Sequence, residues 1–136
     1  MGRLPIPDGQ QREVEGPLVL VVDDDARNLK LAQDVLLAAG FRTLVAKEGM
    51  EAITLASERL PDVILMDLRL PDMDGTEAAR SLADGAGTAA IPVVALSSDV
   101  FGGDAGWLAD AGFAGYLEKP IDIQTFPAQV RAYCRR

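Results

Sequence analysis

Short apolar runs alternate with longer amphipathic segments along this chain. The runs predict five strands, at residues 18–22, 43–46, 63–66, 92–96 and 115–118. Most of them lack polar positions, as expected for strands that are covered on both faces, whereas residues 43–46 should form a half-buried strand. The pattern therefore favours a parallel sheet with helices on both sides.

The segments between the strands carry apolar residues at helical spacing. They predict helices at residues 26–39, 49–59, 75–84 and 125–133. Gly102, Gly103 and Gly106 should make the helix after the fourth strand short or late, because each glycine costs about 1 kcal/mol relative to alanine inside a helix. Pro127 is tolerated only in a first turn, so the N-cap of the last helix is expected at Thr125 or just before it.

Five strand–helix repeats predict an α/β fold with a doubly wound, five-stranded parallel sheet. Residues 18–136 should form this one domain, which at 136 residues in total is long enough for a sizeable core. Residues 1–17 are polar and rich in glycine and proline, which predicts a flexible N-terminal extension.

Charge and composition narrow the classes of partner and location. The formal net charge of −8 argues against direct binding to nucleic acid or to anionic membranes. No apolar stretch is long enough to span a bilayer, and residues 1–17 do not resemble a signal peptide. Cys134 has no partner for an intramolecular disulfide, which fits a cytoplasmic location. The chain contains no histidine, so it cannot donate a phosphoryl group from phosphohistidine.

Carboxylates follow two of the predicted strands, and a lysine follows another. Asp23 and Asp24 come after the first strand, Asp67 after the third and Lys119 after the fifth. The carboxyl ends of parallel strands share one edge of the sheet, so these side chains should converge there. Like charges at contact repel by roughly 4 kcal/mol per pair in a surface-like dielectric. The arrangement therefore predicts a metal-dependent acidic pocket.

Motifs in register over a hundred residues carry a family resemblance. Together they resemble a response-regulator receiver domain of two-component signalling, from residue 18 to the end. The motifs are Val21-Val22-Asp23-Asp24, Leu65-Met66-Asp67, Leu70-Pro71-x-Met73-Asp74-Gly75, Ala95-Leu96-Ser97 and Tyr116-Leu117-Glu118-Lys119-Pro120. The resemblance implies the flavodoxin-like, CheY-like (βα)5 fold with strand order 2-1-3-4-5.

The resemblance also implies a role for each matching residue at the acidic edge. Asp67 matches the aspartate that accepts a phosphoryl group from a partner's phosphohistidine. Asp24 and Asp67 would bind Mg²⁺ through side-chain oxygens, Arg69 would add its backbone carbonyl, and Asp23 would act through water. Oxygen ligands of this kind suit Mg²⁺, and phosphoryl transfer depends mainly on positioning and charge neutralisation.

Three further matches complete the implied site. Ser97 matches the hydroxyl residue that bonds a phosphoryl oxygen, and Lys119 matches the cation opposite it. Tyr116 matches the aromatic switch residue that moves inward when the hydroxyl residue moves. The Lys119-Pro120 peptide is expected to be cis, as in the family.

The implied function is a signalling switch and not an enzyme, apart from its own Mg²⁺-dependent phosphorylation and slow dephosphorylation. Its partners would be a histidine kinase or histidine phosphotransfer protein and a downstream protein. The downstream protein would contact the face formed by the fourth helix, fifth strand and fifth helix. The stretch Asp25-x-x-Asn28-x-Lys30-Leu31 resembles stand-alone cell-cycle regulators and receivers of hybrid kinases, and a receiver excised from a longer protein is the alternative.

Other interpretations remain for these residues. Asp23 to Asp25 alone would suit a loop that caps a helix, and Asp25 itself is expected to be an N-cap. A Mg²⁺-dependent phosphohydrolase would need an aspartate at Arg69, and a pseudo-receiver would lack pocket residues that are present here. Arg69 and Asp99 differ in charge, and we hypothesise that they pair across the pocket and slow hydrolysis.

Overall fold

The computed structural model describes residues 16–98 and 106–134. In chain order the elements are β1 (Leu18–Val22), α2 (Ala26–Ala38), β2 (Arg42–Ala46), α3 (Gly49–Arg59), β3 (Val63–Asp67), α4 (Gly75–Asp84), β4 (Val93–Ser97), α5 (Gly106–Asp110), β5 (Gly115–Glu118) and α6 (Phe126–Tyr133). The described residues leave out part of what the sequence analysis named: Asp99, Gly102, Gly103 and residues 1–15 of the predicted extension.

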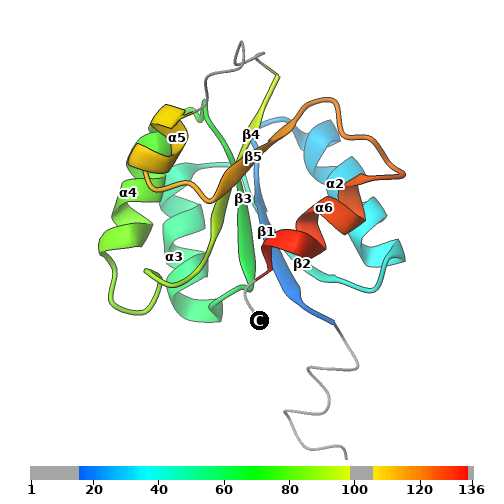
Figure 1. Cartoon of the computed structure of the whole chain (residues 1–136), viewed down its shortest axis with the longest axis horizontal. Helices are drawn as coiled ribbons and strands as arrows, with labels where there is room; N and C mark the ends of the chain where they lie inside the picture. Colours follow the sequence, from blue (N-terminus) through cyan, green and yellow to red (C-terminus); the bar gives the residue numbers. More distant parts are fainter. Residues whose placement is uncertain (1–15, 99–105, 135–136) are drawn as a thin grey trace, which may run out of the picture.

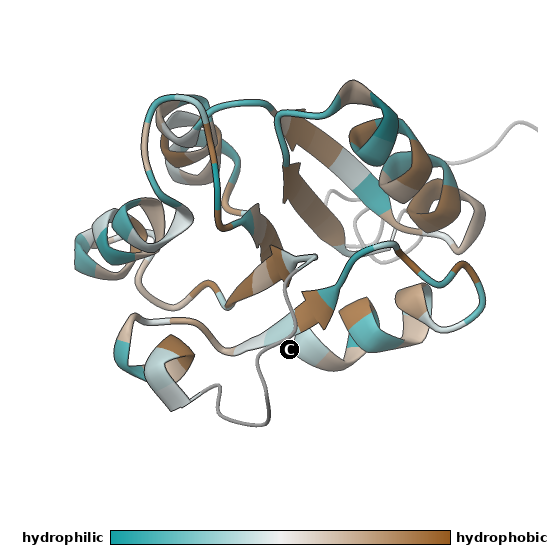
Figure 2. Cartoon of the chain, turned by 90° about the horizontal axis from the view of Figure 1, so that it is seen from above, coloured by the Kyte–Doolittle hydropathy of each residue, from teal (hydrophilic) through white to brown (hydrophobic). Residues whose placement is uncertain are grey.

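All the pairs of neighbouring strands are parallel, as the sequence pattern predicted, and the strand order is β2-β1-β3-β4-β5, as the family resemblance implied. Helices α2 and α6 cover one face of the sheet, and α3, α4 and α5 cover the other (Figure 1). Seen from above, the mainly hydrophobic strands lie between these two helical layers (Figure 2). The chain therefore adopts the predicted doubly wound α/β fold.

Both faces of the sheet are buried, which explains why the strands lack an alternating pattern. On β1, Val19 and Val21 pack towards α2 and α6 with Leu36 and Phe126. The intervening residues Leu20 and Val22 pack on the opposite side with α3 and α4. A strand covered on both faces has no position left for a polar side chain.

The element boundaries agree with the sequence to within a residue or two. Strand β2 begins at Arg42 because its amide donates to the Pro17 carbonyl (2.9 Å), and β3 continues to Asp67, which pairs with Leu96. Helix α5 is short, and Thr125 is the N-cap of α6, so both of these predictions are confirmed. Within the described ranges, no helix is long and apolar enough to cross a membrane.

Candidate functional site

The carboxyl ends of four strands bring the predicted site residues together. Asp67 ends β3 and Ser97 ends β4, and both are nearly buried, with 8% and 5% of their surface exposed. Asp23 follows β1 and is 1% exposed, whereas the neighbouring Asp24 faces solvent. Lys119 follows β5, and its amide donates to the Ser97 carbonyl (2.9 Å). The parallel topology thus gathers residues that are almost a hundred positions apart.

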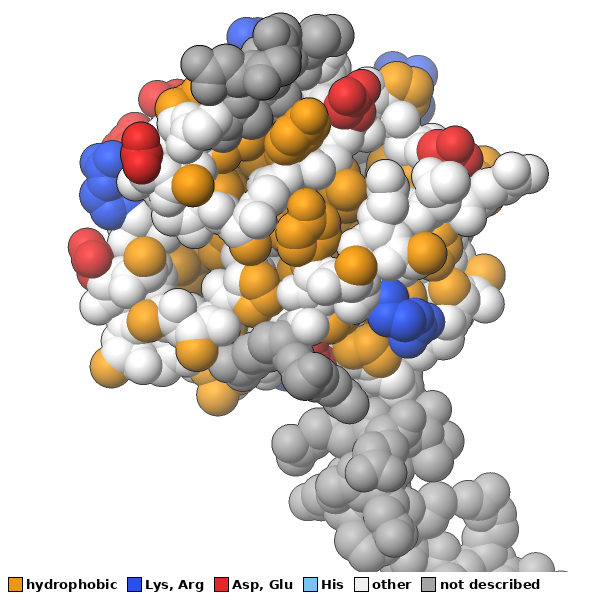
Figure 3. Space-filling view, in the orientation of Figure 1, with side chains coloured by type: hydrophobic (Ala, Val, Ile, Leu, Met, Phe, Trp, Pro, Cys, Tyr) orange, Lys and Arg blue, Asp and Glu red, His pale blue; other side chains and the backbone are white. Residues whose placement is uncertain are grey.

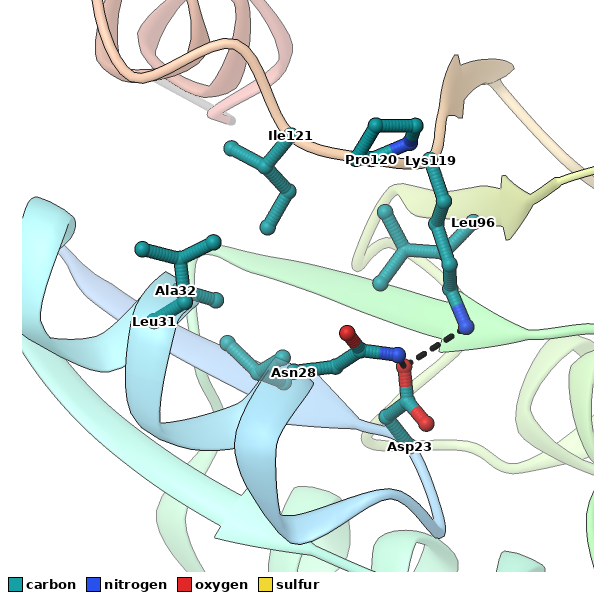
Figure 4. Close-up of a pocket in the computed structure, with 9 residues that line it drawn as sticks. Asp23, Asn28, Leu31, Ala32, Leu96, Lys119, Pro120 and Ile121 are labelled. Carbon is teal, nitrogen blue, oxygen red and sulfur yellow. Dashed lines mark hydrogen bonds and ion pairs between the residues drawn. The ribbon is translucent and has the colours of Figure 1, made fainter.

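Asp23 is held by three donors. Its Oδ1 accepts the Asp25 amide (2.9 Å), and its Oδ2 accepts Asn28 Nδ2 (3.2 Å) and lies 2.6 Å from Lys119 Nζ. Figure 4 shows Asn28 and Lys119 converging on this carboxylate. Asp25 caps α2 by accepting the Arg27 amide (2.8 Å), so its predicted capping role is confirmed. Sequence reasoning missed the contact of Asn28, whose position one turn into a helix was the available signal.

A small cavity of about 30 Å³ borders the ion pair between Asp23 and Lys119, between α2 and the segment after β5. Its apolar lining is Val21, Leu31, Ala32, Leu96, Pro120 and Ile121. An apolar wall lowers the local dielectric and strengthens the attraction between the two charges. The Lys119–Pro120 peptide is cis, as expected.

Asp67 is bonded through both of its oxygens. Oδ1 accepts the Arg69 amide (3.0 Å), and Oδ2 accepts Lys119 Nζ (3.1 Å). Burial raises the pKa of the Asp67 carboxyl above its ordinary value, although the Arg69 amide and the Lys119 charge act against this rise. Keeping the buried Asp67 carboxylate ionised therefore costs free energy, and a further cation beside it would reduce that cost.

Lys119 bridges the two buried carboxylates. Burial alone would lower the pKa of its ammonium group, but the hydrogen bonds and charges of Asp23 and Asp67 outweigh burial and the pKa is raised. The ammonium group therefore stays charged at neutral pH. It lies where it can neutralise an anionic group attached to Asp67.

The donor set fits a hard divalent cation. Asp23, Asp24 and Asp67 each offer a carboxylate oxygen, and these atoms lie within 4.8 Å of one another. One lysine balances only one of these three charges. The neighbouring hollow has a volume of about 200 Å³, and its lining is Asp24, Asp67, Leu68, Arg69, Ser97, Ser98 and Lys119. Carboxylate and carbonyl oxygens beside open space are the donors that Mg²⁺ prefers, because it keeps several waters.

A family model for the response regulator receiver domain matches residues 19–131. The chain belongs to the response regulator receiver family. It is 36% identical over 115 residues to the polar-differentiation response regulator DivK of Brucella ovis, a match that covers 85% of this chain and 94% of DivK. This receiver is therefore a signalling protein of two-component systems.

Solved structures agree with this assignment. The chemotaxis response regulator CheY4 of Vibrio cholerae superposes with a TM-score of 0.80 at 25% identity, over 86% of this chain and 98% of CheY4. The receiver domain of the sensor histidine kinase PA1611 of Pseudomonas aeruginosa gives 0.78 at 29% identity, over 87% and 97% of the two chains. That structure holds a magnesium ion in its active-site cleft.

The receiver presents a charge-poor surface at the last strand. The face made by α5, β5 and α6 points at the viewer in Figure 3, where hydrophobic and uncharged atoms occupy the centre and charged side chains stand mainly near the rim. Two aromatic residues, Trp107 of α5 and Tyr116 of β5, are 43% and 36% exposed. The predicted switch residue Tyr116 thus lies on an edge strand, two positions before Glu118, the residue that pairs with Ser97.

Proposed function

We propose that this receiver is a phosphorylation-dependent switch in a phosphorelay. Asp67 takes a phosphoryl group from the phosphohistidine of a histidine kinase or histidine phosphotransfer protein. The observation that carries the proposal is the position of Lys119 Nζ. It pairs with Asp67 and Asp23, which together with Asp24 form the cluster of three carboxylates. A cytoplasmic location goes with this role, because the kinases that make phosphohistidine use ATP.

The chemistry follows from the contacts of Asp67. A carboxylate oxygen forms a new O–P bond while the N–P bond of the phosphohistidine breaks and its electron pair returns to the imidazole nitrogen. Lys119 Nζ, 3.1 Å from Oδ2, faces the oxygens that gain charge during the transfer. Ser97 lies at the end of the adjacent strand and would donate its hydroxyl to one of those oxygens.

Mg²⁺ would be held by Asp24 and Asp67 through side-chain oxygens, by the Arg69 backbone carbonyl, and by Asp23 through water. When bound, the ion supplies positive charge to the transferred oxygens. Asp23 and Asp67 are positioned for this by hydrogen bonds from Asp25, Asn28 and Arg69. The protein therefore needs little rearrangement to offer these ligands.

Output would pass through protein contact and not through nucleic acid or a membrane. Ser97 moves towards the phosphoryl group, and Tyr116 moves inward from the surface of β5. A downstream protein then contacts the face made by α5, β5 and α6. The charge-poor centre of this face supports the proposal, because charged residues are depleted in the central part of protein–protein interfaces.

Two other functions have less support. A phosphohydrolase of related chemistry needs an acid or base two residues beyond the nucleophile, and Arg69 stands there. A constitutive pseudo-receiver would not need the cluster of Asp23, Asp24 and Asp67. The proposed slowing of hydrolysis by an Arg69–Asp99 pair involves a residue outside the described ranges, and it stays a prediction.

Phosphoramidate tests the donor chemistry, since it carries an N–P bond like that of phosphohistidine. With Mg²⁺, a phosphate-affinity gel should show one shifted band for the natural chain and none for Asp67→Asn or after EDTA. A band that persists in Asp67→Asn would overturn the assignment of the acceptor.

Trp107 gives a separate test of the output face, because it is the one tryptophan in the chain. Beryllium fluoride with Mg²⁺ should change its fluorescence in the natural chain and leave Asp67→Asn unchanged. If the phosphoramidate test shows that the chain is phosphorylated but beryllium fluoride leaves the Trp107 spectrum unchanged, the proposed face is contradicted.

A further inference from the structure

The segment after Asp67 is tied to the first turn of α3. The Asp72 carboxylate accepts two backbone amides of that helix, from Gly49 to Oδ1 (2.8 Å) and from Met50 to Oδ2 (3.0 Å). Glu48, the N-cap residue of α3, makes no side-chain capping bond of its own. The helix is therefore capped by a residue that lies over twenty positions later in the chain.

This contact joins two segments that local structure does not join. The first amides of a helix lack partners within the helix, so a carboxylate placed there is favoured by two hydrogen bonds and by the helix dipole. The Met50 and Gly49 amides accordingly hold the pKa of the exposed Asp72 carboxyl below its ordinary value. The clamp is therefore charged at neutral pH.

The loop that carries Asp72 is closed on itself at its base. Arg69 and Asp74 form an antiparallel bridge, and the Gly75 amide donates to the Leu68 carbonyl (2.8 Å). The Arg69 amide also donates to Asp67 Oδ1. The backbone of Arg69 is thus joined both to the far end of this loop and to the Asp67 carboxylate.

The tip has a second contact with α3. A Cβ added to Gly49 would lie 2.5 Å from Met73 Cγ, so Met73 packs directly against the backbone of this glycine. Gly75 packs directly against the end of β3, since a Cβ there would clash with the Asp67 carbonyl oxygen. The loop is therefore fixed between α3 on one side and the end of β3 on the other.

We propose that Asp72 is a positioning residue for the Mg²⁺ site. By clamping the loop tip to α3, it fixes the Arg69 carbonyl relative to the carboxylates of Asp24 and Asp67. The proposal rests on the proposed function, because it requires Mg²⁺ at that cluster. Residues that orient ligands typically change metal affinity by about 10- to 100-fold, and Asp72, which acts through the loop backbone, should fall at or below the lower end of that range.

Calorimetric titration with MgCl₂ measures this effect, alongside urea unfolding of the same samples. Asp72→Ala should raise the Kd for Mg²⁺ about three- to tenfold. Asp72→Asn keeps an acceptor oxygen without the charge, so it should restore part of the affinity. Asp62→Ala is the matched control, because the Asp62 carboxylate also accepts an amide from another element (Leu18, 2.8 Å) but at the opposite end of the sheet. It should lose stability and keep its Kd.

The outcomes separate the two proposals. A natural chain that binds no Mg²⁺ overturns the proposed function and this inference together. A natural chain that binds Mg²⁺, with the same Kd in Asp72→Ala, overturns the inference alone and leaves Asp72 as a helix cap. An equal loss of affinity in Asp62→Ala would also overturn it, because the effect would then follow stability and not loop position. Asp72→Asn provides the same comparison if Asp72→Ala does not fold.

Discussion

Helices α2, α3 and α4 have 13, 11 and 10 residues, whereas α5 and α6 have five and eight. Burial of the strands follows their place in the sheet: the central strands β1, β3 and β4 are buried along their whole length, whereas the edge strands β2 and β5 each bury one residue, Ala46 and Leu117. The first half of the receiver provides Asp23, Asp24 and Asp67. The second half provides Lys119 and the exposed Tyr116.

This difference separates a fixed part of the site from a part that can move. The carboxylates lie on elements with many buried contacts, so their positions are costly to change. Tyr116 lies on an edge strand with few such contacts, where an inward shift costs little. Lys119 joins the halves through its ion pairs with Asp23 and Asp67. A group attached to Asp67 would compete for this lysine and so act directly on the less buried half.

The largest expected effect comes from the same leucine-to-alanine substitution made in the core of each half. Leu65→Ala, at a fully buried position of β3, should cost about 2–5 kcal/mol of the free energy of unfolding. Leu117→Ala on β5 should cost less, because the edge strand can relax into the space that is left. Urea unfolding measures both losses. Equal losses would contradict the distinction between the halves.

A smaller effect is expected where α4 meets the acceptor strand. Gly75→Ala places a methyl group against the Asp67 carbonyl, and overpacking of this kind typically costs about 1–3 kcal/mol. The Kd for Mg²⁺ should rise as Asp67 is displaced. Gly87→Ala is the control, since its new Cβ would meet only Leu60 Cδ2 at 3.8 Å. An unchanged Gly75→Ala protein would show that this part of the site is not fixed.

Asp67→Asn should raise the Tm of the metal-free protein. Burial raises the pKa of Asp67, so at pH 7 its ionised form destabilises the folded state, and the amide removes this penalty. With Mg²⁺ the natural chain should have the higher Tm of the two, because the ion stabilises only the natural chain. Asp34→Asn is the control, because Asp34 forms an exposed pair with Lys30 that contributes little. A lower Tm for Asp67→Asn in EDTA would contradict this description of the site.

The smallest effect concerns the pH dependence of the Asp72 clamp. Because the pKa of Asp72 is lowered in the folded state, its stabilising contribution is present above the ordinary value of 3.8 and is lost as the pH falls through the lower folded value. The Tm difference between the natural chain and Asp72→Ala should therefore be constant from pH 7 to pH 5 and shrink below about pH 4. A difference at pH 3 that is as large as at pH 7 would show that the carboxylate charge is not involved.

The sequence predicted the fold because local signals and the buried sheet agree. Apolar runs marked the strands, and Gly106 and Pro127 correctly predicted a short α5 and a late start for α6. The convergence of Asp23, Asp67 and Lys119 also followed, since parallel strands place their carboxyl ends on one edge.

Contacts set by tertiary approach could not be predicted in this way. The sequence pattern assigned no role to Asp72, whose carboxylate reaches the first turn of α3 in the folded chain, next to the packing of Met73 on Gly49. The hydrogen bond from Asn28 to Asp23 likewise depends on how α2 leaves the sheet. The sequence offered no signal for the Asp72 contact, and for Asn28 it offered only a position near the start of a predicted helix.

The most direct test of the switch is the intact mass after incubation with acetyl phosphate and Mg²⁺. The natural chain should gain one phosphoryl group, and the gain should be absent in Asp67→Asn and after EDTA. A natural chain that binds Mg²⁺ and gains no mass, or a variant that gains the same mass, would contradict the assignment of Asp67 as the phosphoacceptor.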